Sequence, residues 1–231
     1  MMKTLVVLTG AGISAESGLK TFRDSGGLWE NYDVMEVASI YGWEKNPELV
    51  LRFYNERRRQ LLTAKPNYGH IGLAELEEYF HVYIITQNID DLHERAGSTR
   101  VLHLHGELNK AQSTADPSLI YDVAGKDIKL GDLCEKGSQL RPFVVWFGEP
   151  VPAMEEAITL AEKADLFAVI GSSLVVYPAA GLLEFVPEHI PVFVVDPNVV
   201  NVPHRKKIIY IKEKASKGVE ILKEKLLSEY V

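Results

Sequence analysis

The stretch TGAGISAESGLKTFR (residues 9–23) directly follows the apolar run TLVVL (residues 4–8). Gly10, Gly12 and Ala15 fit the G-x-G-x-x-G/A spacing, in which a strand turns tightly into a helix and backbone amides approach a diphosphate. Taken alone, the pattern is weak evidence for a ligand, because glycines in such turns are often structural. It does predict a strand-turn-helix unit of an α/β sheet at the start of the chain.

The residues after this turn depart from an ordinary nicotinamide dehydrogenase, which would show a second strand and an acidic residue about 20 positions on. The chain instead continues ESGLKTFRDSGGLWENYD (16–33), with three more glycines and no strand pattern. A long glycine-bearing loop that carries Phe22 and Arg23, together with Asp24 and Trp29, fits a mobile cover over a ligand better. The departure counts against a Rossmann oxidoreductase, which the glycine spacing alone leaves open.

The composition is that of an ordinary globular protein, with 46% apolar and 25% charged residues among 231. A net charge of −7 argues against a nucleic-acid binder. The single cysteine, Cys134, makes no internal disulfide and cannot by itself build a zinc site. No apolar stretch approaches the about 20 residues of a membrane span, and the first apolar run is short for a signal peptide. We expect a cytoplasmic protein with no nucleic-acid or membrane partner, and a monomer is among its possible assembly states.

Short apolar runs recur along the chain, each closed by turn or polar residues: TLVVLT (4–9), HVYIITQ (81–87), FVVWFG (143–148), LFAVIGS (166–172), PVFVVDP (191–197) and IIYI (208–211). Runs that are apolar at successive positions suit strands buried on both faces, as in a parallel sheet covered by helices. Helical patterns lie between them: AMEEAITLAEKA, AAGLLEFV and KASKGVEILKEKLLSEY. This alternation predicts an α/β fold with a doubly wound, parallel, Rossmann-like sheet.

Two segments break the alternation and predict a smaller inserted domain. NPELVLRFYNERRRQLL opens with Asn46 as a helix N-cap and Pro47 at the first helical position, which predicts a helical insertion over residues 33–68. Residues 109–141 are polar, turn-rich and weakly periodic, and fit a small β-rich excursion or a loop. The larger domain then comprises residues 1–32, 69–108 and 142–231.

Five motifs follow one another at the spacing of the sirtuins: GAGISAESGLKTFRDSGGLW (10–29), TQNIDDLHERAG (86–97), HLHGEL (103–108), RPFVVWFGE (141–149) and GSSLVVYPAAG (171–181). The chain resembles a sirtuin, an NAD-dependent protein-lysine deacylase, and most resembles the bacterial and mitochondrial-type desuccinylase branch. The resemblance fades in residues 109–140 and toward the C-terminus. It implies NAD as cofactor and acylated-lysine proteins or peptides as partners, with the acyl group passing to ADP-ribose and nicotinamide leaving.

The implied chemistry needs a base that works near neutral pH beside the ribose hydroxyls, a task that suits histidine. His105, in the HG of HLHGEL, matches the family's base, and Asn88 matches a second catalytic residue. His103 is the natural comparison: it lacks a following glycine, and in an extended segment it would share a face with His105. Without the resemblance, most of the seven histidines would be interpreted as surface or packing residues.

Polar residues follow the run HVYIIT at the edge where open α/β sheets bind ligands, although the same residues also suit a capped turn that opens a helix. The resemblance implies cofactor contacts there, in the glycine turn, in the loop after it, at a second strand end and near the C-terminus. These are Gln87, Asn88, Ile89, Asp90, Gly10, Ala11, Gly12, Ser14, Phe22, Arg23, Gly171, Ser172, Ser173, Asp196, Pro197, Asn198 and Ala215. We expect the backbone amides of residues 10–14 to cradle the diphosphate, and Phe22 and Arg23 to close over the nicotinamide ribose. Asp196 departs from the family, which commonly has Asn there.

The stretch FYNERRRQLL places Tyr54 and Arg57 on one face of a helix. The resemblance implies that this pair meets the distal carboxylate of succinyl- or malonyl-lysine, and a small Ser25 leaves acetyl-lysine acceptable as well. On the residues alone, a solvated basic face of Arg52, Arg57, Arg58 and Arg59 is the favoured interpretation. The peptide is expected to lie as an added strand along Val145, Trp146, Phe147, Gly148, Glu149, Val175 and Val176.

Sirtuins usually carry four zinc cysteines between the HG and FGE motifs, and this interval holds Cys134 alone. We therefore expect no metal, and a module of residues 109–141 held by the packing of Leu119, Ile120, Tyr121, Val123, Ile128 and Leu130. An NAD- or ADP-ribose-binding module, or an ADP-ribosyltransferase on the same fold, is the alternative function. The retained His105 argues against a binding module, because binding alone does not require the base.

Overall fold

The computed structural model describes residues 2–20, 28–29, 32–198, 200, 202 and 207–231. Its larger lobe is built on a six-stranded parallel sheet with the strand order β11-β10-β9-β1-β4-β5. The strands are β1 (Thr4–Thr9), β4 (His81–Thr86), β5 (Val101–His103), β9 (Leu166–Ile170), β10 (Val192–Val195) and β11 (Ile208–Ile211). The chain leaves β1 toward β4 on one side and returns to β9 on the other. This order confirms the predicted α/β Rossmann-like sheet and places its switch point beside β1.

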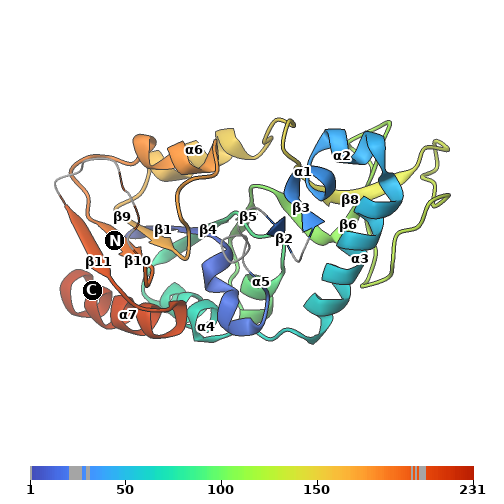
Figure 1. Cartoon of the computed structure of the whole chain (residues 1–231). Coiled ribbons are helices and arrows are strands. Elements are labelled where there is room, and N and C mark those ends of the chain that lie inside the picture. Colours follow the sequence, from blue (N-terminus) through green and yellow to red (C-terminus); the bar gives the residue numbers. More distant parts are fainter. Residues whose placement is uncertain (1, 21–27, 30–31, 199, 201, 203–206) are drawn as a thin grey trace.

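Helices cover both faces of this sheet, as its continuous apolar strands require. Figure 1 shows α6 (Met154–Glu162) on one side of the strands, and α4 (Tyr68–Glu75) and α7 (Ala215–Tyr230) on the other. Alternate residues of β1 enter the two cores: Leu5 and Val7 pack with α4 and α7, whereas Val6 and Leu8 pack with α6. Within the described residues, no helix is long and apolar enough to span a membrane.

Short helical turns connect the strands of the larger lobe. The glycine-rich stretch forms two 3-10 helices, Ala11–Ile13 and Ala15–Ser17, in place of the predicted helix. The 3-10 helix Leu76–Glu78 precedes β4, α5 (Leu92–Ala96) follows it, and the predicted helical run near residue 182 is the 3-10 helix Ala179–Phe185.

The smaller lobe combines three helices with an antiparallel sheet (Figure 1). Its helices are α1 (Val34–Val37), α2 (Ile40–Lys45) and α3 (Pro47–Thr63), and its sheet has the order β7-β6-β8, with β6 (Gly106–Ser113), β7 (Ile120–Asp122) and β8 (Leu140–Val144). A two-stranded pair, β2 (Leu28–Trp29) and β3 (Tyr32–Asp33), precedes α1. The helix α3 begins as predicted, since Asn46 Oδ1 accepts the Leu49 amide at 3.1 Å and Pro47 follows as the first helical residue.

The interpretation of residues 143–148 as a strand of the parallel sheet was wrong. β8 ends at Val144 and pairs antiparallel with β6 in the smaller lobe. The apolar side chains of Val144 and Trp146 are buried there against α1 and α3. The run is apolar because it packs in the core of the smaller lobe. Hydrophobicity alone does not show which of the two cores an apolar run enters.

The expected packing of the 109–141 module is only partly right. Ile128 is buried against Leu51 of α3, but Ile120 and Leu130 are 43% and 47% exposed. Side-chain hydrogen bonds also attach the module to α3: Asn55 Nδ2 donates to the Ile128 carbonyl at 2.8 Å, and Asn55 Oδ1 accepts the Ile128 amide at 2.9 Å. The predicted domain limits at 108/109 and 141/142 fall inside β6 and β8, and the division itself stays a prediction.

We expect Gly171→Ala to lower the free energy of unfolding by about 1–3 kcal/mol, because overpacking against backbone cannot relax easily. Gly171 has φ +62°, and an added Cβ would lie 2.4 Å from the Ile13 nitrogen and 2.6 Å from the Gly12 carbonyl carbon. Urea unfolding measures the change. Gly181→Ala is the matched control, since its Cβ would meet only the Tyr177 ring at 3.6 Å. Equal effects of the two substitutions would contradict this packing.

Candidate functional site

A cavity of about 570 Å³ opens at the carboxyl ends of β1, β4, β9 and β10 and extends to the smaller lobe. It lies at the switch point of the sheet, where open α/β folds bind ligands. Most of the residues predicted for the site line it: Gly10, Ala11, Gly12, Ser14, Tyr54, Arg57, Gln87, Asn88, Ile89, Asp90, His105, Val145, Trp146, Phe147, Gly148, Glu149, Gly171, Ser172, Ser173, Val176, Asp196, Pro197, Asn198 and Ala215. Val175 does not line it and is 67% exposed. Phe22 and Arg23, with Asp24 and Ser25, lie outside the described residues.

The glycine turn packs backbone to backbone against the end of β9. The Gly12 amide donates to the Gly171 carbonyl at 2.9 Å and the Gly10 amide donates to the Ile170 carbonyl at 3.1 Å. The amides of Ile13 and Ser14 also donate within the turn, to the carbonyls of Gly10 and Ala11. Four of the five amides in residues 10–14 thus already donate within the protein, and only the Ala11 amide has no such bond among the described residues. The expected cradle of amides over the diphosphate stays a prediction.

A buried hydrogen-bond network joins this turn to the end of β4. Ser14 Oγ donates to Asp90 Oδ2 at 2.9 Å and accepts from Asn88 Nδ2 at 3.1 Å. The same Asn88 nitrogen donates to the Gly10 carbonyl at 3.2 Å. Both side-chain amide hydrogens of Asn88 are therefore used by the turn, and its side-chain oxygen Oδ1 makes no other hydrogen bond among the described residues and can accept from a ligand.

Asp90 lines the cavity and also lies in the turn that leads into α5. Its Oδ1 accepts the Leu92 amide at 3.2 Å at the start of α5, while its other oxygen holds Ser14 at the cavity. Burial raises the pKa of Asp90, although the hydrogen bonds from Ser14 and Leu92 act in the opposite direction. The carboxyl group thus joins the turn before α5 to the glycine turn at the cavity.

His105 lies in the turn between β5 and β6 with its ring in the cavity. Its Nδ1 is 2.9 Å from the Gln87 carbonyl oxygen, which accepts, so the neutral ring carries its hydrogen on Nδ1 and a lone pair on Nε2. Burial lowers the pKa of His105 despite this hydrogen bond, so the imidazole is neutral and basic at pH 7. The following Gly106 has φ +80°, and a Cβ there would lie 2.2 Å from the Phe143 carbonyl oxygen.

His103 has a different environment and does not line the cavity. Its Nδ1 is 3.1 Å from the Asn88 carbonyl oxygen, and its Nε2 is 2.8 Å from Glu94 Oε1. Burial lowers the pKa of His103, but the hydrogen bond and the charge of Glu94 outweigh it, so the net shift is upward. The His103 ring therefore joins the backbone of Asn88 to the Glu94 side chain of α5 and helps to fix the position of Asn88.

The end of the cavity away from the smaller lobe is polar, and the start of α7 lines it. Asp196 is buried, and its Oδ1 accepts the Asn198 amide at 2.9 Å. Gln87 Nε2 donates to Ser172 Oγ at 2.8 Å and so ties the ends of β4 and β9 together. Ala215 begins α7 beside these groups, where Ser216 donates its amide to Glu16 Oε2 at 2.9 Å.

Tyr54 and Arg57 lie together on α3 and line the end of the cavity in the smaller lobe. They are 0% and 9% exposed, so a solvated face is the wrong interpretation for Arg57. It is equally wrong for Arg58, whose Nε donates to the Leu108 carbonyl at 2.8 Å, whereas Arg59 is exposed and paired with Asp127. The helix has two buried sides because it packs between the cavity and β6.

The segment expected to bind peptide has most of its amides committed. The Val145 amide donates to the His105 carbonyl at 3.0 Å, and the Phe147 amide donates to the Ala38 carbonyl at 2.9 Å. The Trp146 amide donates to Glu149 Oε2 at 2.8 Å. An added peptide strand here would therefore depend on Gly148 and on backbone carbonyls, and the peptide contacts of this segment stay a prediction.

Several lining residues were not predicted from the sequence: Ala15, Glu16, Leu19, Lys20, Val34, Ala38, Leu61, Leu108, Val144, Val151, Pro178, Val195 and Lys214. Neither were His70 and His93 beneath the glycine turn, where His93 Nε2 is 3.1 Å from Thr9 Oγ1 and His70 Nε2 is 3.4 Å from Ser14 Oγ. His93 lies inside the motif TQNIDDLHERAG, which is the sequence signal that could have pointed to it. No local sequence pattern points to His70, because its contact with Ser14 spans 56 residues.

Among the residues that the structure describes, no group of three or more His, Cys, Asp or Glu side chains could hold a metal ion. Cys134 is buried, with its Sγ 3.2 Å from Ser138 Oγ and 3.5 Å from Ser113 Oγ. The expected absence of zinc stays a prediction.

The parallel sheet, the glycine turn and a cavity that gathers amides, carboxylates and a neutral imidazole define an α/β protein with a dinucleotide-type site. The chain belongs to the Sir2 family, whose model matches residues 10–178. It is 54% identical over 231 residues to an NAD-dependent protein deacylase of Bacteroides thetaiotaomicron, with 98% of this chain and 99% of the relative covered. It is 55% identical to an NAD-dependent protein deacylase of Helicobacter pylori, with 98% of each chain covered.

Solved structures agree with this assignment. A crystal structure of a Sir2 homolog–NAD complex superposes with a TM-score of 0.87 at 39% identity and covers 98% of this chain and 90% of that one. A Sir2–p53 peptide–NAD+ complex superposes with a TM-score of 0.81 at 35% identity and covers 96% of this chain and 92% of that one.

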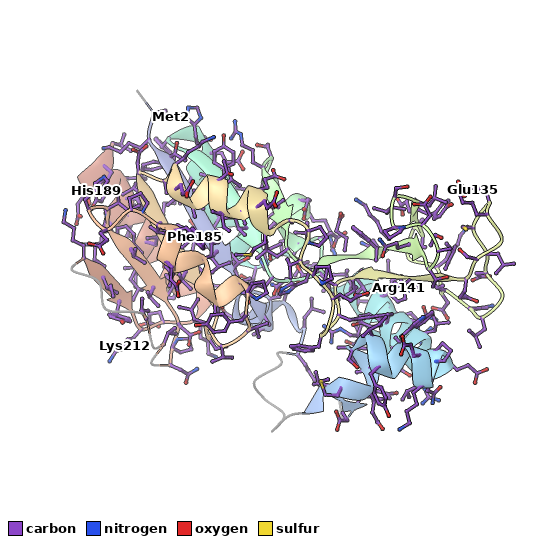
Figure 2. The ribbon with its side chains drawn as sticks, turned by 90° about the horizontal axis from the view of Figure 1, so that it is seen from above. Met2, Glu135, Arg141, Phe185, His189 and Lys212 are labelled. Carbon is purple, nitrogen blue, oxygen red and sulfur yellow. The ribbon has the colours of Figure 1, made fainter. Side chains whose placement is uncertain are left out.

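We expect the protein to lose stability between pH 6.5 and pH 5, because burial lowers the pKa of His70 to about 4 and that of His93 well below its ordinary value. Below about pH 6.5 these two histidines bind protons in the unfolded chain but remain neutral in the folded one. Their contribution to the free energy of unfolding is therefore complete above about pH 6.5 and decreases as the pH falls. Urea unfolding at a series of pH values measures it. His93→Gln should flatten the slope, and His189→Gln, at an exposed position (Figure 2), should leave it unchanged. A slope unaltered by His93→Gln would contradict the assignment.

Proposed function

We propose that the protein is an NAD-dependent protein-lysine deacylase, which transfers the acyl group to ADP-ribose and releases nicotinamide. The observation that carries this proposal is the neutral, half-buried imidazole of His105 in one cavity with the polar strand ends on one side and the buried Tyr54 and Arg57 on the other. The names of the relatives, NAD-dependent protein deacylases at 54% and 55% identity over nearly the whole chain, support it.

The chemistry of the cavity fits NAD. Its volume of about 570 Å³ falls in the range of about 300–1,000 Å³ that is usual for ligand sites. The Ala11 amide suits a diphosphate oxygen, the side-chain oxygen Oδ1 of Asn88 suits a ribose hydroxyl, and the carboxylate of Asp196 suits hydroxyls at the end of the cavity near α7. These groups come from the ends of β1, β4 and β10, on both sides of the switch point where open α/β sheets bind dinucleotides.

Each side chain then has a defined task in acyl transfer. NAD, when bound, supplies a ribose carbon that loses nicotinamide and accepts the acyl oxygen, and ribose hydroxyls that complete the transfer. His105 Nε2 takes a proton from a ribose hydroxyl, while its Nδ1–H stays on the Gln87 carbonyl and holds the ring in place. Asn88 is held by Ser14 and Gly10, so its free oxygen keeps one position relative to that base.

Removal of succinyl or malonyl groups is the finer proposal. The buried pair Tyr54 and Arg57 offers a hydroxyl and a guanidinium at the end of the cavity opposite the strand ends. A cation buried beside a hydroxyl favours a ligand that carries a carboxylate, which an acetyl group lacks. Acetyl groups are smaller and remain acceptable in the same cavity.

An ADP-ribosyltransferase or a plain NAD-binding module is the competing function. Both would use the same strand ends, but neither requires the pair on α3. Nicotinamide release without loss of the acyl group from a peptide would favour the transferase, and NAD binding without nicotinamide release would favour the module. A cytoplasmic location and a monomeric state are further proposals, which cell fractionation and light scattering test.

We expect His105→Ala to reduce NAD-dependent deacylation of an acetyl-lysine peptide by about 100-fold or more, because general base catalysis contributes about 10²–10⁴-fold. Mass spectrometry of the peptide with and without NAD measures the loss. His189→Ala, at the surface, is the control. Deacylation that survives the His105 change at the rate of the unaltered enzyme would exclude this side chain as the base.

We expect Arg57→Met to lower kcat/KM for a succinyl-lysine peptide by about 10- to 100-fold relative to an acetyl-lysine peptide, since a hydrogen bond to a charged group contributes about 1.5–3 kcal/mol. Parallel assays of the two peptides give this ratio. Arg59→Met, on the exposed side of the same helix, should not alter it. If both arginine variants change the ratio equally, or neither does, the proposed carboxylate contact is wrong.

A further inference from the structure

The indole of Trp146 donates a hydrogen bond to the hydroxyl of Tyr54, with Nε1 and Oη 2.9 Å apart. Both side chains are almost completely buried, at 2% and 0% exposed, and both line the cavity. An indole N–H is a donor only, so the hydroxyl oxygen must be the acceptor. The hydroxyl hydrogen consequently points elsewhere, and among the described residues no other hydrogen bond engages this group.

The indole is held in position by an ion pair behind it. Arg141 stacks its guanidinium 3.6 Å from the centre of the Trp146 ring. It also makes two hydrogen bonds to Glu149, Nη1 to Oε1 at 2.6 Å and Nη2 to Oε2 at 2.8 Å. Glu149 Oε2 accepts the Trp146 amide as well, at 2.8 Å. Figure 2 labels Arg141 on β8, where the sheet of the smaller lobe approaches the junction of the lobes.

This arrangement gives the Tyr54 hydroxyl one fixed role. Burial raises the pKa of Tyr54 far above its ordinary value, so the phenol keeps its proton at neutral pH. With one lone pair used by Trp146, the hydroxyl acts as a donor beside the guanidinium of Arg57, one helical turn along α3. A carboxylate accepts hydrogen bonds only, and it matches two neighbouring donors.

We propose that Trp146 is a specificity-determining positioning residue, whose indole N–H orients the Tyr54 hydroxyl as a donor to the carboxylate of an acidic acyl group. The inference rests on the proposed deacylase function and adds a residue to its acyl selectivity. An acetyl group ends in a methyl and leaves the oriented hydrogen unpaired in a buried place, which disfavours it relative to succinyl. Trp146 acts through Tyr54 and requires no contact of its own with the carboxylate.

The test is a double-mutant cycle on the ratio of kcat/KM for succinyl-lysine to that for acetyl-lysine peptides. Trp146→Phe keeps an aromatic ring and removes the N–H, and should lower the ratio about tenfold, mainly through a higher KM for the succinyl peptide. Tyr54→Phe should lower it by a similar factor. The double variant should show no further loss, because the two groups act as one unit.

Trp43→Phe is the matched control, since Trp43 packs 5.5 Å from Trp146 and does not line the cavity. It should leave the ratio unchanged. A ratio within twofold of the unaltered enzyme in Trp146→Phe, or full additivity in the double variant, would overturn the inference while the proposed function stands. An unaltered enzyme that removes acetyl but no succinyl or malonyl groups would overturn the acidic-acyl proposal itself, and the inference with it.

A second readout keeps the test independent of how well Trp146→Phe folds. In ¹H–¹⁵N spectra, the indole proton of Trp146 should shift upfield in Tyr54→Phe, because its hydrogen-bond acceptor is lost. The same resonance should move when a succinyl-lysine peptide is added and much less with an acetyl-lysine peptide. An indole resonance that is identical with and without the Tyr54 hydroxyl would show that the hydrogen bond does not exist in solution.

Discussion

The contact between Gly12 and Gly171 is the constraint on which the rest of the site depends. The turn after β1 and the turn after β9 meet backbone to backbone, with the Gly12 amide 2.9 Å from the Gly171 carbonyl oxygen. A Cβ on Gly12 would lie 2.7 Å from the Gly171 Cα, so glycine is required for this approach. Because the turn is held there, Ser14 can reach Asp90 and Asn88 at the end of β4.

Most backbone amides of the glycine turn serve the protein. Those of residues 10, 12, 13 and 14 stabilise the turn itself, and side chains from three other strand ends complete the ligand-facing surface. His105 is also placed by backbone contacts, since the Gln87 carbonyl orients its ring and Gly106 lets β6 pass close to β8. On the other side, the Arg141–Glu149 pair fixes Trp146, which reaches Tyr54. The cavity thus lies between two sides: backbone contacts at the strand ends hold one, and the Arg141–Glu149 ion pair holds Trp146 on the other.

Local signals in the sequence predicted the parts of the molecule that local physics decides. The buried strands and the start of α3 at Asn46 and Pro47 follow from hydrophobic runs and capping. The position of residues 143–148 did not, because an apolar run does not say which core receives it. The distinct roles of His103 and His105 depend on carbonyl groups 15 and 18 residues away, and the Trp146–Tyr54 hydrogen bond spans 92 residues. The family resemblance supplied His105, Tyr54 and Arg57, whose shared place in the cavity the residues alone did not indicate.

The fate of the acyl group is the most direct test of the central claim that one cavity brings an acylated lysine to the ribose of NAD. The measurement is mass spectrometry of the small-molecule products from a succinyl-lysine peptide and NAD, with nicotinamide quantified in the same sample. The account predicts one O-succinyl-ADP-ribose for each nicotinamide and each free lysine. Succinate released with NAD intact, or ADP-ribose attached to a peptide that keeps its acyl group, would contradict it.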